Sequence, residues 1–127
     1  MSTDGEEPLY KVESQEIVGS AMEVLNGIGH GFHEKPYENA LVIEFNLRGI
    51  PCRQQQQYDI IYKAEKVGDY VPDLIAYEKI IVDTKVIEKI TDREVGQMMN
   101  YLKVTGLRLG YILNFKHARL EWKRVIR

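Results

Sequence analysis

The chain has 127 residues, with 44% hydrophobic and 28% charged side chains, a composition typical of one globular domain. The net charge is −2, and the single cysteine excludes an internal disulfide and suits a reducing compartment. No apolar run reaches the roughly 18 residues that a membrane-spanning helix needs, and the polar, acidic N-terminus is unlike a secretory signal. We therefore expect a cytoplasmic protein with no membrane partner.

The first part of the chain predicts two helices. Residues 1–12 show no periodicity and are expected to form a flexible N-terminal tail, which leaves residues 13–127 as a single domain. Apolar residues recur at helical spacing from Ser14, a suitable N-cap, until the glycine-rich segment 26–32 ends the helix. A second helix is expected over residues 36–49, from a proline in its first turn to a glycine at its end.

The rest of the chain predicts strands and one further helix. A capping box formed by Thr91 and Glu94 predicts a helix over residues 91–105, followed by a glycine. A turn is expected at residues 63–69, and the glutamines before it are expected to lie on a wetted strand. The expected strands are residues 52–62, two buried strands within 70–87, 108–115 and 119–126. This order of elements indicates one α/β or α+β unit.

Three charged side chains interrupt the two buried strands within residues 70–87. Asp73, Asp83 and Lys85 lie inside or beside apolar runs, where burial of an unpaired charge costs several kcal/mol. Because side chains alternate along a strand, Asp83 and Lys85 share one face. These charges therefore need partners, either from one another or from a bound ion.

The loop between the two strands decides where Asp73 lies. A three-residue loop at 77–79 would place Asp73 directly opposite Asp83, whereas a two-residue turn would place it opposite Thr84 on the other face. The loop contains neither glycine nor asparagine, which two-residue type I′ turns require, so the longer loop is favoured. Two adjacent carboxylates repel unless a cation lies between them, and Mg²⁺ or Mn²⁺ suits such a pair. The alternative is a salt-bridged group on a half-exposed sheet face.

The same residues resemble a known catalytic pattern. Pro72 and Asp73, followed after nine residues by Asp83-Thr84-Lys85, are similar to the motif of the PD-(D/E)XK nuclease superfamily. That superfamily includes restriction enzymes, Holliday-junction resolvases and recombination exonucleases. Position 83 carries aspartate in place of the commoner glutamate. The resemblance implies a restriction-endonuclease-like αβββαβ core, in which helices flank a mixed central sheet.

Two further motifs extend this resemblance over about residues 14–127. Gln97 and Tyr101 stand four residues apart on the predicted helix and resemble the Q-x-x-x-Y motif of exonuclease-like branches. The segment GFHEKPY, with its Gly31, Glu34 and Tyr37, resembles the signature of the GxxExxY protein family within the superfamily. From its own spacing to Leu41 at i+4, however, Tyr37 is expected to be a core residue.

The resemblance implies a metal-dependent reaction centred on the charged strands. Asp73 and Asp83 would bind Mg²⁺ or Mn²⁺, and the backbone carbonyl of Thr84 would be a further ligand. Lys85 would assist an attacking water. Hydrolysis of a phosphodiester bond would follow by in-line attack.

Four residues outside these strands are implied to support the site. Glu34 would complete the acidic cluster as a metal ligand or orient a water, and Glu38, one turn later, is the alternative. Gln97 and Tyr101 would line the site and contact the nucleic-acid backbone, although the spacing alone also fits an ordinary pair on a helix surface.

The resulting functional hypothesis is a Mg²⁺- or Mn²⁺-dependent nuclease acting on nucleic acid, with DNA favoured over RNA and a homodimer considered. One alternative is a catalytically silent domain that binds nucleic acid or a partner protein, since the chain is acidic whereas tight DNA binders are usually basic. Another is a structural domain with a salt-bridged sheet face.

The C-terminal end has its own charge pattern. Residues 102–127 carry seven basic side chains against Glu121 alone. This segment is either a phosphate-binding surface or a solvated face. Trp122 within it is either a packing residue or an exposed aromatic ring on which a base could stack.

Overall fold

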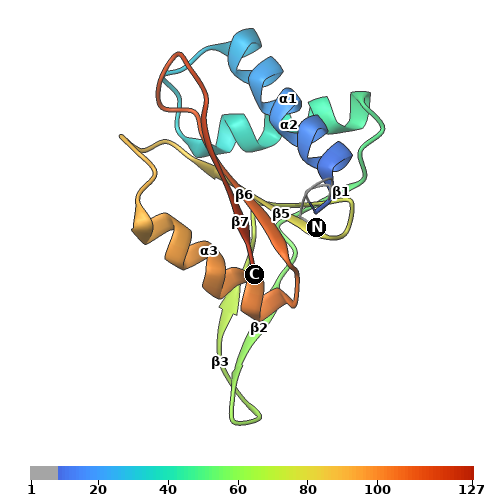
Figure 1. Cartoon of the computed structure of the whole chain (residues 1–127), viewed down its shortest axis with the longest axis vertical. Coiled ribbons are helices and arrows are strands. Elements are labelled where there is room, and N and C mark those ends of the chain that lie inside the picture. The colour runs from blue at the N-terminus through green and yellow to red at the C-terminus, as the bar shows by residue number, and fades with distance from the viewer. Residues whose placement is uncertain (1–8) are drawn as a thin grey trace, which may run out of the picture.

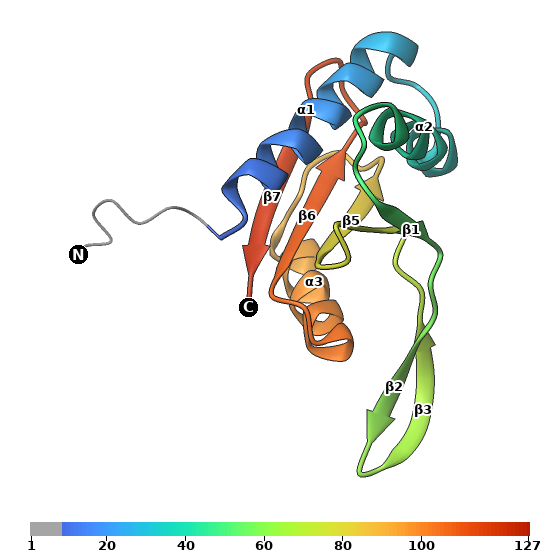
Figure 2. The ribbon, with the colours of Figure 1, turned by 90° about the vertical axis from the view of Figure 1, so that its right-hand side faces the viewer.

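The structure is a computed structural model that describes residues 9–127. Three helices cover a five-stranded sheet, two on one face and one on the other (Figures 1 and 2). No helix among the described residues combines the length and the hydropathy needed to cross a membrane. The helices are α1 (Lys11–Ile28), α2 (Glu34–Leu47) and α3 (Asp92–Thr105).

The central sheet is mixed, as expected. Its strand order is β1-β4-β5-β6-β7, and β5 runs parallel to β6 while the other neighbours are antiparallel. Helix α3 connects the two parallel strands. The sheet thus has the architecture expected of a restriction-endonuclease-like core. Its strands are β1 (Cys52–Gln54), β4 (Leu74–Ala76), β5 (Ile80–Lys85), β6 (Leu109–Asn114) and β7 (Glu121–Ile126).

A separate two-stranded hairpin, here called the arm, projects from the domain between β1 and β4 (Figure 2). It consists of β2 (Tyr58–Tyr62) and β3 (Glu65–Tyr70). The predicted single strand over 52–62 is therefore wrong, because the chain breaks at Gln55, whose φ is 59°. The predicted turn over 63–69 is also wrong, because Lys63 and Ala64 alone form the tip in left-handed conformations with φ of 48° and 68°.

The helix boundaries differ slightly from those expected. Helix α1 begins at Lys11 instead of Ser14, so the last part of the predicted tail is helical, while residues 1–8 lie outside the described residues. Helix α2 begins at Glu34, and Pro36 is its third residue, which a first turn tolerates. The capping box of Thr91 and Glu94 is present at the start of α3 as predicted.

Alternation along the strands gives each face of the sheet its own core. Leu74 and Val82 join the cluster built with α1 and α2, whereas Ile81 and Ile112 join the cluster around Met98 of α3. All six residues of β6 are buried because this strand is central and covered on both faces. Its glycine, Gly110, lies so close to Met98 that a Cβ would clash with the methionine side chain.

The register of β4 and β5 is the one that the longer loop predicts. Ala76 pairs with Ile80, and residues 77–79 form the loop between the strands. Tyr77 and Glu78 adopt left-handed conformations with φ of 57° and 60°. The charged residues of the two strands consequently come together on the face that α3 covers.

Candidate active site

Lys85 lies between a carboxylate on its own strand and an amide on the helix above. Its Nζ is 3.3 Å from Oδ2 of Asp83 and donates a 3.1 Å hydrogen bond to Oε1 of Gln97 on α3. Asp83 and Lys85 are two residues apart on β5, so their side chains share the face toward α3. Both side chains are largely buried, with exposed fractions of 15% and 22%. The ammonium group is thus held in place by two partners.

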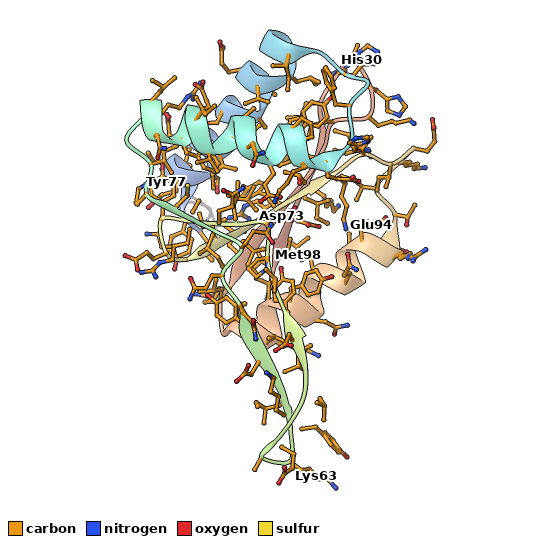
Figure 3. All side chains as sticks on the ribbon, turned by 180° about the vertical axis from the view of Figure 1, so that it is seen from behind. His30, Lys63, Asp73, Tyr77, Glu94 and Met98 are labelled. Atoms are coloured by element: carbon orange, nitrogen blue, oxygen red, sulfur yellow. The ribbon has the colours of Figure 1, made fainter. Side chains whose placement is uncertain are left out.

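Asp73 lies just before β4 and is tied directly to β5. Its Oδ2 accepts hydrogen bonds from the backbone N–H and from the hydroxyl of Thr84, both at 2.8 Å. The charge of Asp73 also acts on the nearby carboxyl of Asp83 and raises its pKa. In Figure 3, Asp73 lies at the base of the arm, between α2 and α3 in that view. The two carboxyl groups of the predicted motif are therefore neighbours.

The electrostatics of this pair favour a cation. The pKa of Asp83 is raised from its ordinary value of 3.8 to about 7, chiefly by burial; the charge of Lys85 opposes the shift, and the nearby Asp73 adds to it. The charge of Lys85 therefore does not offset burial and the neighbouring carboxylate together. Hard divalent cations prefer such oxygen ligands, so the donor set fits Mg²⁺ or Mn²⁺.

Two tyrosines form the wall of the site next to these carboxylates. Tyr101 of α3 stacks on Tyr70 of β3, with ring centroids 3.9 Å apart and planes 12° from parallel. Burial and then the charge of Asp83 raise the pKa of both hydroxyls. The predicted Gln97 and Tyr101 therefore face the site together. Tyr70 was missed, although its position three residues before Asp73 was a usable signal.

Glu34 lies at the end of β5 but outside a compact acidic cluster. It is the first residue of α2, and its Oε2 accepts a 3.2 Å hydrogen bond from the backbone N–H of Val86, directly after Lys85. Within residues 9–127, no three histidine, cysteine or acidic side chains are grouped closely enough to hold a metal ion. An ion bound here would thus rely on Asp73 and Asp83, with backbone oxygens and waters.

Glu38 is buried, and its carboxylate already accepts hydrogen bonds from three side chains. Its Oε2 accepts hydrogen bonds from Gln54 at 2.7 Å, from Gln55 at 2.8 Å and from Lys35 at 3.2 Å. The backbone N–H of Gln55 in turn donates to the carbonyl of Asp73 at 3.1 Å. Two of the four glutamines expected on a wetted strand therefore fix a buried carboxylate and the backbone of Asp73.

Tyr37 is a core residue, as its spacing predicts. Its side chain is fully buried and stacks on Phe115, with ring centroids 4.6 Å apart. Its hydroxyl donates a 2.8 Å hydrogen bond to the carbonyl of Gly29 and accepts one of 3.3 Å from the N–H of Phe32. Tyr37 thus anchors the loop that leads to Glu34 at the start of α2.

Comparison with known proteins gives one match. Residues 11–125, nearly the whole chain, match the sequence model of the PD-(D/E)XK nuclease superfamily. The comparisons with curated proteins and with solved structures found no match.

Proposed function

Because the chain belongs to the PD-(D/E)XK nuclease superfamily, we propose that it is a Mg²⁺- or Mn²⁺-dependent nuclease that hydrolyses phosphodiester bonds. The observation that carries the proposal is the adjacent pair Asp73 and Asp83 beside Lys85, with the pKa of Asp83 raised to about 7. Superfamily motifs of this kind occur in restriction enzymes and Holliday-junction resolvases, which act on DNA. DNA is therefore the proposed substrate, while a homodimer, a cytoplasmic location and membership of the GxxExxY family remain predictions.

Asp73, Asp83 and the backbone carbonyl of Thr84 are the proposed metal ligands. The bound ion would supply positive charge at the scissile phosphate and acidify a water. Thr84 holds Oδ2 of Asp73 through two hydrogen bonds, which fixes the orientation of that carboxylate. A ligand that is already oriented loses less entropy when the ion binds.

Lys85 is proposed to stabilise negative charge that develops on the phosphate. The hydrogen bond to Gln97 and the ion pair with Asp83 orient its ammonium group before substrate arrives. Gln97 keeps its amide N–H groups for a phosphate oxygen, and Tyr101 lines the same surface. Glu34, which is exposed, is proposed to orient the attacking water; it is preferred over Glu38, whose carboxylate already has three donors.

A catalytically silent domain that binds nucleic acid or a partner is the second candidate. It is favoured by one observation: Lys85 pairs with Asp83, and Thr84 donates to Asp73, so each carboxylate has a partner from the protein itself. The net charge of −2 also weakens non-specific attraction to DNA.

Calorimetric titration with Mn²⁺, together with cleavage assays on double-stranded, single-stranded and branched DNA and on RNA, tests the proposal. We expect the wild type to bind the ion and cleave DNA, and Asp73→Asn to lose both. Asp59→Asn is the matched control, because Asp59 is an exposed aspartate on the arm with an exposed fraction of 57%. Metal binding without cleavage of any substrate would favour the silent domain, and absence of metal binding would overturn the metal site.

A further inference from the structure

A groove runs between α1 and β7, on the sheet face opposite Asp83. Both ribbon views place α1 along β7 (Figures 1 and 2). The groove consists of two adjoining hollows of about 340 and 300 Å³, and both are lined by Met22 and Trp122. Trp122 pairs with Leu113 of the α1-side core, whereas Asp83 pairs with Ile112 on the α3 side. The groove is thus separate from the candidate active site.

Trp122 provides an accessible aromatic surface at the middle of this groove. Its exposed fraction is 43%, which is high for the largest side chain in the protein. One part of the indole packs against Tyr111, with ring centroids 6.0 Å apart and planes at 47°. The ring is therefore held by the protein but left partly open, as a stacking surface for a planar ligand would be.

The first hollow, at one end of the groove, carries a positive charge. Arg119 lines the first hollow, is exposed, and has no hydrogen-bond or ion-pair partner within residues 9–127. Among the described residues that line the two hollows, none is acidic. Glu121, which precedes Trp122 on β7, already accepts hydrogen bonds from Ile90 and Asn114. Glu23, which follows Met22 on α1, lines neither hollow. This end of the groove therefore suits an anion.

The other end contains a buried polar atom that lacks a partner. Ser14 lines the second hollow with an exposed fraction of 7%, and its hydroxyl is the one buried side-chain N or O atom in residues 9–127 without a hydrogen bond. A buried hydroxyl without a partner is unfavourable, so native structures rarely contain one. A ligand with a polar edge would satisfy it.

We propose that this groove binds single-stranded nucleic acid, with a base stacked on Trp122. Arg119 binds a flanking phosphate, and the hydroxyl of Ser14, which no hydrogen bond holds in its buried orientation, turns into the hollow and bonds to the edge of a base. The proposal rests on the proposed function, since it assumes a nucleic-acid substrate. Because the groove and Asp83 lie on opposite faces of the sheet, the bound base belongs to an extension of the strand away from the cleaved bond. An apolar peptide would leave the charge of Arg119 without an anionic partner, and sedimentation tests whether a second copy of the chain occupies the groove.

The sole tryptophan of the chain makes the test direct. The intrinsic fluorescence of Trp122 is followed while metal-free Asp83→Asn protein is titrated with an oligothymidylate of about 16 nucleotides or with a blunt duplex. We expect saturable quenching by the single strand and little by the duplex. Arg119→Ala should weaken binding about fivefold or more and lower the salt slope by about one phosphate contact.

Lys123→Ala is the matched control for Arg119→Ala. Lys123 follows Trp122 directly, but alternation turns its side chain to the opposite face of β7, the side on which Val125 joins the α3 core. This variant should retain the quenching and most of the affinity. Equal losses for Lys123→Ala and Arg119→Ala would reduce the effect to net charge and would overturn the proposed site.

Three further variants keep the proposal open to refutation. By anisotropy of a labelled oligothymidylate, Trp122→Ala should weaken binding about tenfold or more, whereas Trp122→Phe should keep most of it. Ser14→Ala should weaken binding several-fold without loss of thermal stability. Absence of quenching would overturn the proposal, as would a dimer in sedimentation that Trp122→Ala dissociates. Because the titrations use a variant without the catalytic carboxylate and without metal, failure of the proposed nuclease activity would not change their outcome.

Discussion

The two faces of the central sheet receive different side chains from the same strand. On β5, Ile80 and Val82 enter the core beneath α1 and α2, while Ile81 and then Asp83 and Lys85 face α3. The first face is closed by apolar packing. The second is apolar only up to Ile81 and then becomes charged.

The difference shows how a site can be built without weakening the whole sheet. On the α1 side, the polar Thr84 is buried but donates to Asp73, so its hydrogen bonding is satisfied. On the α3 side, Asp83 is largely buried and its pKa is raised, so the charged form of its carboxyl lowers the stability of the metal-free fold. On strand β5 the unfavourable burial of charge therefore lies on the face that carries the proposed chemistry, as stability and activity often compete at functional sites.

The largest expected effect comes from removing the strained charge. Asp83→Asn should abolish Mn²⁺ binding and cleavage, while the thermal stability of the metal-free protein stays equal or rises, because Lys85 keeps its hydrogen bond to Gln97. Thermal melts with and without Mn²⁺ measure both effects. A purely structural ion pair predicts a loss of about 3–5 kcal/mol for this variant and no metal effect on the wild type. That pattern would contradict the nuclease site.

The next effect is the pH dependence of the metal-free protein. The pKa of Asp83 rises from 3.8 in the unfolded chain to about 7 in the folded protein. Between these two pH values the folded state therefore holds a proton on Asp83 that the unfolded state has already released. The unfolding free energy should therefore fall as the pH rises from about 4 to about 7. Urea denaturation across this range measures it, and Asp83→Asn should lose this part of the dependence. An identical pH profile for both proteins would refute the assignment.

A smaller effect is expected when the support of Lys85 is removed. Gln97→Ala deletes the acceptor 3.1 Å from the ammonium group and should lower the cleavage rate about 10- to 100-fold, in the range of supporting residues at metal sites. Affinity for Mn²⁺ should change little, since Gln97 is not a proposed ligand. Asn100→Ala, at an exposed position of the same helix, serves as the control. Equal rates for the two variants would remove Gln97 from the site.

The smallest effect belongs to the closed face. Tyr37→Phe removes the 2.8 Å hydrogen bond to the carbonyl of Gly29 but keeps the stacking on Phe115. We expect a loss of about 1 kcal/mol in the free energy of unfolding, measured in urea. Tyr62→Phe, at an arm position with an exposed fraction of 62%, should cost nothing measurable.

The sequence predicted those helices and strands that are buried on one face or on both faces. The strands around Asp73 and Asp83 were placed, with their register, because apolar runs flank a loop too poor in glycine for a two-residue turn. The helix opened by Thr91 was predicted from its capping box. These elements carry strong local signals that tertiary packing reinforces.

The parts that were missed carry weak local signals. Strand β3 belongs to an arm with much exposed surface, so no alternation of apolar and polar residues marks it, and its tip turns at Lys63 and Ala64 without glycine. The donors to Glu38 were missed because glutamine is usually solvent-exposed, and only the tertiary fold brings Gln54 and Gln55 to that carboxylate.

The arm leaves and rejoins the sheet at paired residues, because Gln54 on β1 is the partner of Leu74 on β4. The sheet therefore fixes the two ends of the arm next to each other. The entropy of closing such a loop grows only slowly with its length, so the tip around Lys63 is free to lengthen or shorten among relatives. The base of the arm is not free to change in this way, because Tyr70 stacks on Tyr101 beside the carboxylates. Changes in length are therefore expected at the tip, while the base of the arm beside Asp73 and Asp83 stays constant.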